Sequence, residues 1–313
     1  MRRLPPPYNA AAVVAGERNL RREPHVSDVI SVSQLAAPPA RPDDSHKGTF
    51  GTVVVVGGCA TMIGAPAICA RAAFRGGAGL VKIAANEKVL PHVLTIEPHA
   101  TGVVLKGEVV EQVRSIRQAD TGHRAVLAVG PGLGDSQDAR RLVRMLIDLD
   151  MPLVLDADGL NHLAAAGVRV THRDQPRVLT PHPGEFERLA KPLGITASAI
   201  DETTRPEAAT ALAQAHDAVV VLKGHHTLVT DGKRLYTNAT GNPVLATGGS
   251  GDVLTGLIAA LMAQHFDAFN AACLAVHAHG LAGDKWLAQH GRSGMRATEI
   301  ADLVPDVFEQ LRG

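Results

Sequence analysis

Residues 53–58 read Val-Val-Val-Val-Gly-Gly, four consecutive β-branched residues followed by two glycines. β-Branched side chains favour strands, and a short run that is apolar at every position is typical of a strand buried on both faces. An alanine-rich, helix-like segment at residues 65–73 follows. A buried strand, a glycine turn and a helix form the repeating unit of a parallel sheet covered by helices.

The same unit recurs along the chain. Further short apolar runs, most of them followed by Gly, Asp, His or Lys, stand at residues 80–84, 126–129, 153–155, 178–179 and 219–222. We therefore expect an α/β fold with a central, mostly parallel sheet and helices on both faces. In such open sheets, ligands bind beyond the carboxyl ends of the strands, which is where these polar residues fall.

The composition is that of an ordinary soluble globular enzyme. Of the 313 residues, 45% are hydrophobic and 20% charged, which excludes a wholly disordered chain. Lys and Arg (31) balance Asp and Glu (31), so we expect neither nucleic acid nor a membrane surface as a partner. No apolar run is long enough for a membrane span. Three scattered cysteines, Cys59, Cys69 and Cys273, fit a cytoplasmic protein better than a disulfide framework or a zinc site.

The first 45 residues differ from the rest of the chain. They hold seven of the nineteen prolines and little hydrophobic periodicity. We predict a flexible arm or linker over residues 1–45, with a short strand or helix possible at Val29–Leu35, and one globular domain over residues 46–313.

The segment from Asn242 to Asp252 has the strongest chemical character. Three glycines within four residues precede a helix-like run at residues 253–263. A helix N-terminus offers unpaired N–H groups and the positive end of the helix dipole, and glycine lets a phosphate approach the backbone. We predict an anion hole with Asp252 beside it, although an N-terminal acid that only stabilises the helix is the alternative. The predicted anion hole consists of Gly248, Gly249, Ser250 and Gly251.

Two familiar nucleotide motifs are excluded. No Gly-Lys-Ser/Thr follows the glycines, so this is not a Walker A loop. Residues 130–134, Gly-Pro-Gly-Leu-Gly, lack the spacing of a Rossmann fingerprint and indicate a tight turn that either touches a ligand or does not.

Carboxylates follow two other predicted strands. Asp156 and Asp158 point to the same side if the backbone stays extended, and they diverge if a turn begins at Asp156. The sequence thus leaves open a shared metal site or a pair that caps a helix. Glu185 either holds Mg²⁺ through water or is the N-terminal acid of a helix.

Residues 223–227, Lys-Gly-His-His-Thr, form a predicted hairpin-like turn and a candidate nucleotide rim. Adjacent side chains in a strand face apart, so His225 and His226 are expected to be surface residues rather than metal ligands.

A series of motifs stands in a fixed order from His46 to the end. They are Gly57-Gly58, Gly64-Ala65, 75–81 (Arg-Gly-Gly-Ala-Gly-Leu-Val), 129–134, 156–161 (Asp-Ala-Asp-Gly-Leu-Asn), 179–185 (Leu-Thr-Pro-His-Pro-Gly-Glu), 222–224 with Thr227, and 241–252. With these motifs the chain resembles the ADP/ATP-dependent NAD(P)H-hydrate dehydratases, a branch of the ribokinase-like superfamily.

The resemblance implies an enzyme that dehydrates the S-epimer of NADH or NADPH hydrate. ADP (or ATP) would be converted to AMP (or ADP) and phosphate, with Mg²⁺ as cofactor. The resemblance makes Asp252 catalytic, since Asp252 would accept the hydroxyl proton. The other implied contacts are Ala65, Gly134, His182 and Asp252 with the hydrate, and Lys223, Gly224, His225, His226, Thr227 and Gly251 with the nucleotide.

The resemblance also implies a homotetramer that works together with a separate NAD(P)H-hydrate epimerase. In related sequences an epimerase domain often precedes this one, and residues 1–45 are too short for it, so we expect no epimerase activity here. Two features depart from the relatives. Residues 59–63 replace the Ser or Asn and the aromatic that relatives carry, and residues 182–185 keep only the glutamate of the Asn-x-x-Glu metal motif of sugar kinases.

Two other functions remain as alternatives. A small-molecule kinase of the same fold, such as a hydroxymethylpyrimidine or thiazole kinase, would release a stable phosphoester. A non-catalytic nucleotide-binding sensor would need no acid facing the phosphates. The motifs at residues 130–134 and 180–185 favour the dehydratase over the kinase, and Asp252 argues against the sensor.

Overall fold

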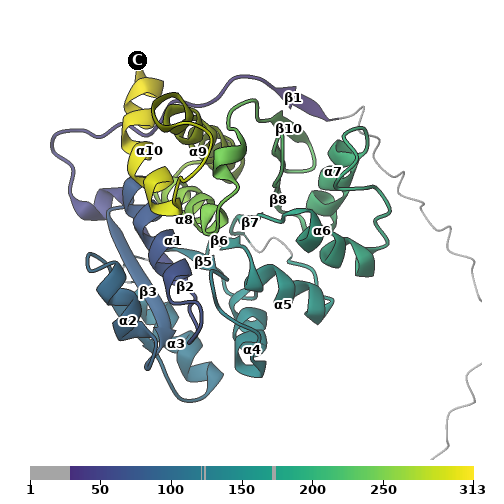
Figure 1. Ribbon diagram of the computed structural model, residues 1–313. Helices are drawn as coiled ribbons and strands as arrows, with labels where there is room; N and C mark the ends of the chain where they lie inside the picture. Colours follow the sequence, from purple (N-terminus) through teal and green to yellow (C-terminus); the bar gives the residue numbers. More distant parts are fainter. Residues whose placement is uncertain (1–28, 121, 123–124, 171–173) are drawn as a thin grey trace, which may run out of the picture.

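The computed structural model describes residues 29–120, 122, 125–170 and 174–313. Its centre is one sheet in the order β1-β10-β9-β8-β7-β6-β5-β2-β3-β4 (Figure 1). The strands are β1 (Ile30–Val32), β2 (Thr52–Val56), β3 (Leu80–Asn86), β4 (Thr101–Leu105), β5 (Ala125–Val129), β6 (Leu153–Leu155), β7 (Arg177–Leu179), β8 (Val219–Leu222), β9 (Leu228–Thr230) and β10 (Arg234–Thr237).

The sheet is parallel except at β9, which runs antiparallel to both β8 and β10. The expected α/β fold with a mostly parallel sheet is therefore confirmed. Strands β2, β3 and β4 follow one another outward, and the chain then returns to pair β5 with the other side of β2. In open α/β sheets, ligands bind at the carboxyl ends of the strands where the strand order reverses, which here are the ends of β2 and β5.

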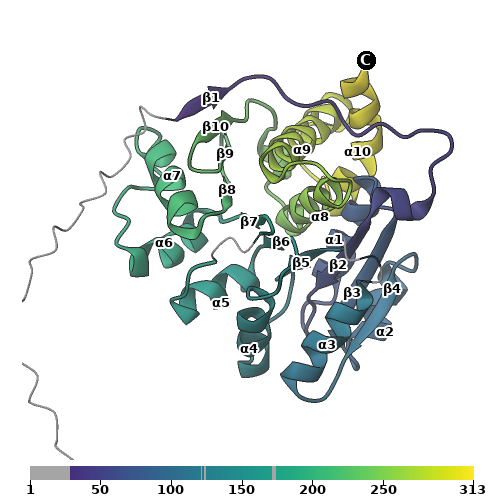
Figure 2. The same cartoon turned by 180° about the vertical axis from the view of Figure 1, so that it is seen from behind.

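Helices cover both faces of the sheet, as the apolar strands require (Figures 1 and 2). Side chains alternate across β2, so Val53 and Val55 face one helical layer while Val54 and Val56 face the other. The first layer holds α1 (Gly64–Arg75), α2 (Leu90–Ile96), α8 (Ser250–Ala263), α9 (Ala268–His290) and α10 (Ala297–Arg312). The second layer holds α3 (Val109–Ala119), α4 (Gln137–Leu146), α5 (Asp158–Ala166), α6 (Pro183–Ala190) and α7 (Arg205–His216).

The four valines of β2 are completely buried, and each contributes about 1.5–3 kcal/mol relative to an exposed side chain. Close packing of α1 against α8 positions the start of α8 over the sheet. A Cβ atom at Gly256 would overlap the carbonyl oxygen of Cys69, so glycine is needed where the two helices approach. Among the described residues, no helix combines the length and apolar character that crossing a bilayer requires.

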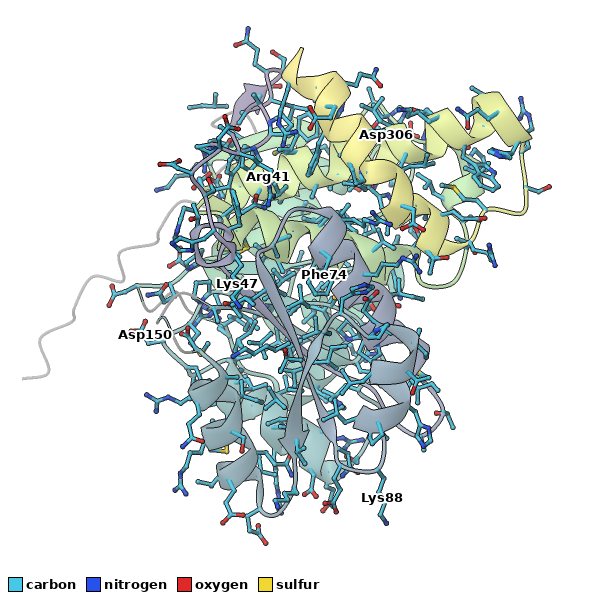
Figure 3. All side chains as sticks on the ribbon, turned by 90° about the vertical axis from the view of Figure 1, so that its left-hand side faces the viewer. Arg41, Lys47, Phe74, Lys88, Asp150 and Asp306 are labelled. Carbon is cyan, nitrogen blue, oxygen red and sulfur yellow. The ribbon has the colours of Figure 1, made fainter. Side chains whose placement is uncertain are left out.

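The segment before β2 lies along the domain. Strand β1 pairs in parallel with β10, so of the two possibilities within Val29–Leu35, a short strand or a helix, the structure has the strand. The Arg41 guanidinium stacks 3.7 Å from the Phe50 ring centre and donates to the carbonyl of Gly77 at 3.0 Å. Figure 3 labels Arg41 and Lys47 on this segment, and Lys47 is the first residue of a short 3₁₀ helix (Lys47–Phe50) that leads into β2. Residues 30–45 of the expected arm are thus in contact with the domain, whereas residues 1–28 lie outside the described residues.

Candidate active site

The loops that leave β2, β5 and β6 interlock at the carboxyl edge of the sheet. The Gly58 N–H donates to the carbonyl of Pro131, and the Gly130 N–H donates to the carbonyl of Val56, both at 3.0 Å. Gly130 has a φ of +123°, and a Cβ atom there would overlap the carbonyl oxygen of Asp156. The glycines of this predicted tight turn therefore allow three loops to stack without side chains between them.

The glycine-rich segment turns directly into α8, as the sequence predicts. Gly249 caps the helix with a φ of +89°, which favours glycine. The Ser250 N–H donates to the carbonyl of Thr247 at 3.2 Å, so this amide is used inside the turn. Gly251 and Asp252 follow in the first turn, where N–H groups have no acceptor within the helix. The Ser250 amide, which was expected in the anion hole, is thus occupied within the turn, and an anion hole formed by the amides of Gly248, Gly249 and Gly251 stays a prediction.

Side chains of helix α9 form hydrogen bonds with this loop, and no pattern in the sequence indicated these contacts. The Asp284 carboxylate accepts from the Gly241 N–H at 3.0 Å and from the Asn242 side-chain amide at 2.8 Å. The His279 Nε2 atom lies 3.1 Å from the Ser250 hydroxyl, and burial lowers the pKa of His279 to about 4. His279 is therefore neutral near pH 7 and orients the first residue of α8 without adding charge.

Asp252 has the electrostatics of a base that works near neutral pH. Burial is the main cause that raises its pKa from 3.8 to about 7. The negative charge of Asp156 adds to this rise, and the Lys223 ammonium opposes it. A carboxylate tuned to this range suits general acid–base chemistry.

Next to Asp252 lies a buried ion pair between Lys223, expected at the nucleotide rim, and Asp156, for which the sequence left open a metal site or a helix cap. The Nζ atom of Lys223 lies 2.7 Å from Oδ1 of Asp156 and 3.6 Å from Oε2 of Glu185. Asp156 is 1% exposed, and its Oδ2 accepts from the Thr255 hydroxyl at 2.8 Å. Burial alone would raise the pKa of Asp156, but the ammonium and hydrogen bonds from Lys223, Thr180 and Thr255 hold it below its ordinary value.

The two carboxylates at residues 156 and 158 diverge, so the open question from the sequence is answered. Ala157 has a φ of +49° and turns the chain between them. Asp158 Oδ2 accepts from the Gly134 N–H at 2.8 Å, while Asp156 faces Lys223. Within the described ranges, no group of three or more His, Cys, Asp or Glu side chains could hold a metal ion.

His182 and Glu185 form a reciprocal cap at the start of α6. The His182 ring accepts from the N–H groups of Gly184 and Glu185, and the Glu185 carboxylate accepts from the His182 N–H at 2.8 Å. The reading of Glu185 as the N-terminal acid of a helix is thus confirmed. Burial raises the pKa of Glu185, although Lys223 opposes the rise. Contact of His182 with the hydrate and of Glu185 with Mg²⁺ through water stays a prediction.

The candidate nucleotide rim is a hairpin turn between β8 and β9, as predicted. The rings of His225 and His226 lie 3.8 Å apart at the surface. The expectation that these side chains face apart was wrong, because His226 has a φ of +52° in a turn rather than a place in a strand. The buried Arg205, which no sequence motif singled out, donates to the carbonyls of His225 at 2.6 Å and Leu222 at 3.4 Å.

Of the residues expected to contact the hydrate, Ala65 lies in the first turn of α1, Gly134 in the loop after β5, His182 at the start of α6 and Asp252 in the first turn of α8. A Cβ atom at Gly132 would lie 3.1 Å from the Cβ of Ala65, and one at Gly134 would lie 3.2 Å from the Cβ of Cys59. A cavity of about 350 Å³ adjoins this region, lined by Asp135, Arg140, Asp158, Asn161, His162, Ala165 and Arg188. A larger cavity of about 880 Å³ lies at the amino ends of β6 and β7, away from these groups; Met145, Met151 and Gln175 are among its lining residues.

Comparison with known proteins gives one consistent result. A family model described as NAD(P)H-hydrate dehydratase matches residues 53–306. The bifunctional NAD(P)H-hydrate repair enzyme Nnr of Thermofilum pendens is 36% identical over 288 residues, which cover 88% of this chain and 53% of that protein. The ADP-dependent (S)-NAD(P)H-hydrate dehydratase of Neisseria meningitidis serogroup B is 39% identical over 267 residues, covering 84% of this chain and 86% of that protein.

A crystal structure is similar over the same region. It is that of the ADP/ATP-dependent NAD(P)H-hydrate dehydratase from Bacillus subtilis co-crystallised with ATP and Mg²⁺. The TM-score is 0.73 at 32% sequence identity, and the match covers 87% of this chain and 94% of that one. The chain therefore spans most of the dehydratases it matches and about half the length of the bifunctional relatives.

Proposed function

The chain belongs to the NAD(P)H-hydrate dehydratase family, and we propose that it uses ADP or ATP to dehydrate the S-epimer of NADH or NADPH hydrate. The observation that carries this proposal is the place of Asp252. A carboxyl group with a pKa of about 7 stands directly after a glycine turn, in the first turn of a buried helix.

The chemistry explains why a dehydratase needs a kinase-like site. The hydrate carries a hydroxyl on the reduced nicotinamide ring, and hydroxide is a poor leaving group. Transfer of a phosphoryl group to that hydroxyl converts it into phosphate, which the lone pair of the ring nitrogen can expel. The iminium ion that remains then loses a proton from the neighbouring ring carbon to solvent, which restores the double bond of the reduced nicotinamide. The products are then NAD(P)H, phosphate, and AMP from ADP or ADP from ATP.

Asp252 would accept the hydroxyl proton as the oxygen attacks the terminal phosphoryl group. A carboxylate with a pKa of about 7 cannot deprotonate an alcohol in advance, because even water has a pKa of about 15.7. Proton transfer is therefore late and concerted with phosphoryl transfer. The amides of Gly248, Gly249 and Gly251 would stabilise the charge that develops on the phosphoryl oxygens.

The described residues supply no all-protein cage for Mg²⁺, since no cluster of three suitable side chains exists among them. This fits an ion held mainly by the phosphates of the nucleotide, with Glu185 reaching it through water. When bound, the ion would neutralise phosphate charge. Glu185 keeps its cap at α6 and its place near Lys223 in either case.

The remaining contacts with the nucleotide and the hydrate would come from residues at the carboxyl edge of the sheet. The turn at residues 223–227 and Gly251 would border the adenine nucleotide, and Ala65, Gly134 and His182 would border the hydrate. We further propose a cytoplasmic homotetramer that receives its S-epimer from an epimerase. The three free cysteines support a reducing compartment.

One experiment separates the dehydratase from its two alternatives. The chain is mixed with NADPH hydrate and ADP, and the absorbance band of reduced nicotinamide and the release of phosphate are followed together. Growth of the band with one phosphate released for each NADPH formed supports the proposal. A phosphorylated hydrate that accumulates without the band would indicate a kinase, and nucleotide binding without turnover would indicate a sensor.

A further inference from the structure

Asp156 links two elements that carry the proposed reaction. Its Oδ1 accepts from the Lys223 ammonium at 2.7 Å, at the end of β8, and its Oδ2 accepts from the Thr255 hydroxyl at 2.8 Å, in α8. Thr255 lies three residues after Asp252, so both side chains belong to the same stretch of the helix. Asp156 and Thr255 are 1% and 0% exposed, which keeps water from competing for these bonds.

The ion pair lies directly against the first turn of α8. A Cβ atom at Gly251 would lie 3.4 Å from Lys223 Nζ and 3.5 Å from Asp156 Oδ2. The backbone of the helical turn that carries Asp252 therefore lies in contact with both charged groups. A displacement of either charged group would displace the N-terminus of the helix.

The charges that face Asp252 come from several elements. Asp156 follows β6, Asp158 starts α5, and Lys223 follows β8. Cys69 of α1 stays neutral because burial, and then the charges of Asp252 and Asp156, raise the pKa of its thiol.

Two other titratable groups face this cluster through Lys223. His279 of α9 is neutral near pH 7, and Glu185 of α6 lies near Lys223. Since one ammonium faces several carboxylates, the pairing of Lys223 with Asp156 decides how strongly Lys223 stabilises the charged form of Asp252.

We propose that Asp156 is a positioning residue: it fixes the Lys223 ammonium between β8 and α8 and sets the charge that Asp252 faces. This inference rests on the proposed function only in taking Asp252 as the base. Without the negative charge of Asp156, the ammonium would stabilise the ionised form of Asp252 more strongly. Asp252 would then be a weaker base, with the same shape around it.

The test is Asp156→Asn, which keeps the shape and the acceptor oxygen but removes the charge. The carboxyl carbon of Asp252 is followed by ¹³C NMR as a function of pH in the full chain, and its signal is assigned by its loss in Asp252→Asn. We expect the titration of Asp252 to move down by about one pH unit or more. The acidic limb of kcat/KM should move in the same direction, with kcat lower by about tenfold.

Lys223→Met should shift the titration of Asp252 in the opposite direction. It leaves Asp156 charged and unpaired, so the titration of Asp252 should move up, and the double variant should return toward the wild type. If Asp156→Asn does not fold, the titration of Asp252 in Lys223→Met is the test. The absence of an upward shift in that variant would overturn the proposal.

Thr255→Val is the matched control, because it removes one hydrogen bond of Asp156 and no charge. It should lower the melting temperature and leave the titration of Asp252 in place. If Asp156→Asn lowers activity without moving the titration of Asp252, Asp156 has a purely structural role and the proposal is overturned. The NMR measurement needs no substrate, so an inactive wild-type chain would contradict the proposed function and leave this test intact.

Discussion

The Lys223 Nζ atom lies 2.7 Å from Asp156 Oδ1, where strands β8 and β6 end. The lysine that the sequence suggested as a nucleotide contact is thus already paired with a buried carboxylate. Its first role is to neutralise charge beneath the helix that carries Asp252. Substitutions here should therefore change stability as well as binding.

Lys223→Met should be strongly destabilising. It leaves the Asp156 carboxylate buried without its partner, and the loss of one member of a buried pair costs about 3–5 kcal/mol. The matched control is Arg144→Met, which breaks the exposed pair of Arg144 with Asp148 and should cost less than about 1 kcal/mol. Urea denaturation measures both free energies of unfolding, and equal losses would contradict the assignment of a buried pair.

Gly251→Val should abolish nucleotide binding that calorimetry can measure. A β-branched side chain would meet Lys223 Nζ and Asp156 Oδ2, and it would cover the amides at the start of α8. Gly251→Ala places only a methyl group there and should weaken binding less than Val does. Lys223→Ala should weaken binding by about ten- to a hundredfold. If Lys223→Ala proved more severe than Gly251→Val, the main phosphate contact would lie at the end of β8.

Asp252 should destabilise the fold at neutral and higher pH. The pKa of its carboxyl is raised from 3.8 to about 7, so the folded state binds more protons than the unfolded state between these values. Stability contributed by this group is therefore present at low pH and is lost as pH rises toward 7. Asp252→Asn should melt higher than the wild type near pH 8, and the difference should disappear near pH 4. A lower melting temperature at pH 8 would show that the charged form is stabilised in the fold.

Two truncations test the N-terminal segment. A chain that starts at residue 44 lacks β1 and the stack of Arg41 on Phe50, so its melting temperature should fall by about 5 °C or more. A chain that starts at residue 29 keeps both, and the proline-rich composition of the first residues leads us to expect little loss. Equal melting temperatures for the two chains would mean that β1 contributes nothing to stability.

The sequence was sufficient for the inner strands β2, β3 and β5 to β8, because most of their residues are buried, whereas the more exposed β4 and β10 were not among the expected strands. The runs expected at residues 153–155 and 219–222 coincide with β6 and β8. The start of α8 could also be predicted, because a Gly-Gly-Ser-Gly turn occurs in few other structural contexts. Strand β1 was only one of two possibilities, because three residues at the edge of a sheet carry little periodicity.

The charge interactions of the site could not be predicted from the sequence to the same extent. Asp156 and Lys223 are 67 positions apart, and Thr255 lies 99 positions from Asp156. Only the order of the strands brings them together, and no local pattern reports that order. Arg205 and Asp284 were missed for the same reason, because each supports a loop distant in sequence.

The central claim is that Asp252 accepts the hydroxyl proton while phosphate is transferred, and single-turnover kinetics of Asp252→Asn test it most directly. Enzyme in excess over NADPH hydrate is mixed with ADP, and the reduced-nicotinamide band is followed while calorimetry measures nucleotide binding separately. We expect the rate to fall by about 10²–10⁴-fold with ADP affinity within a few-fold of wild type. A variant that keeps more than about a tenth of the wild-type rate would contradict the assignment of Asp252 as the base.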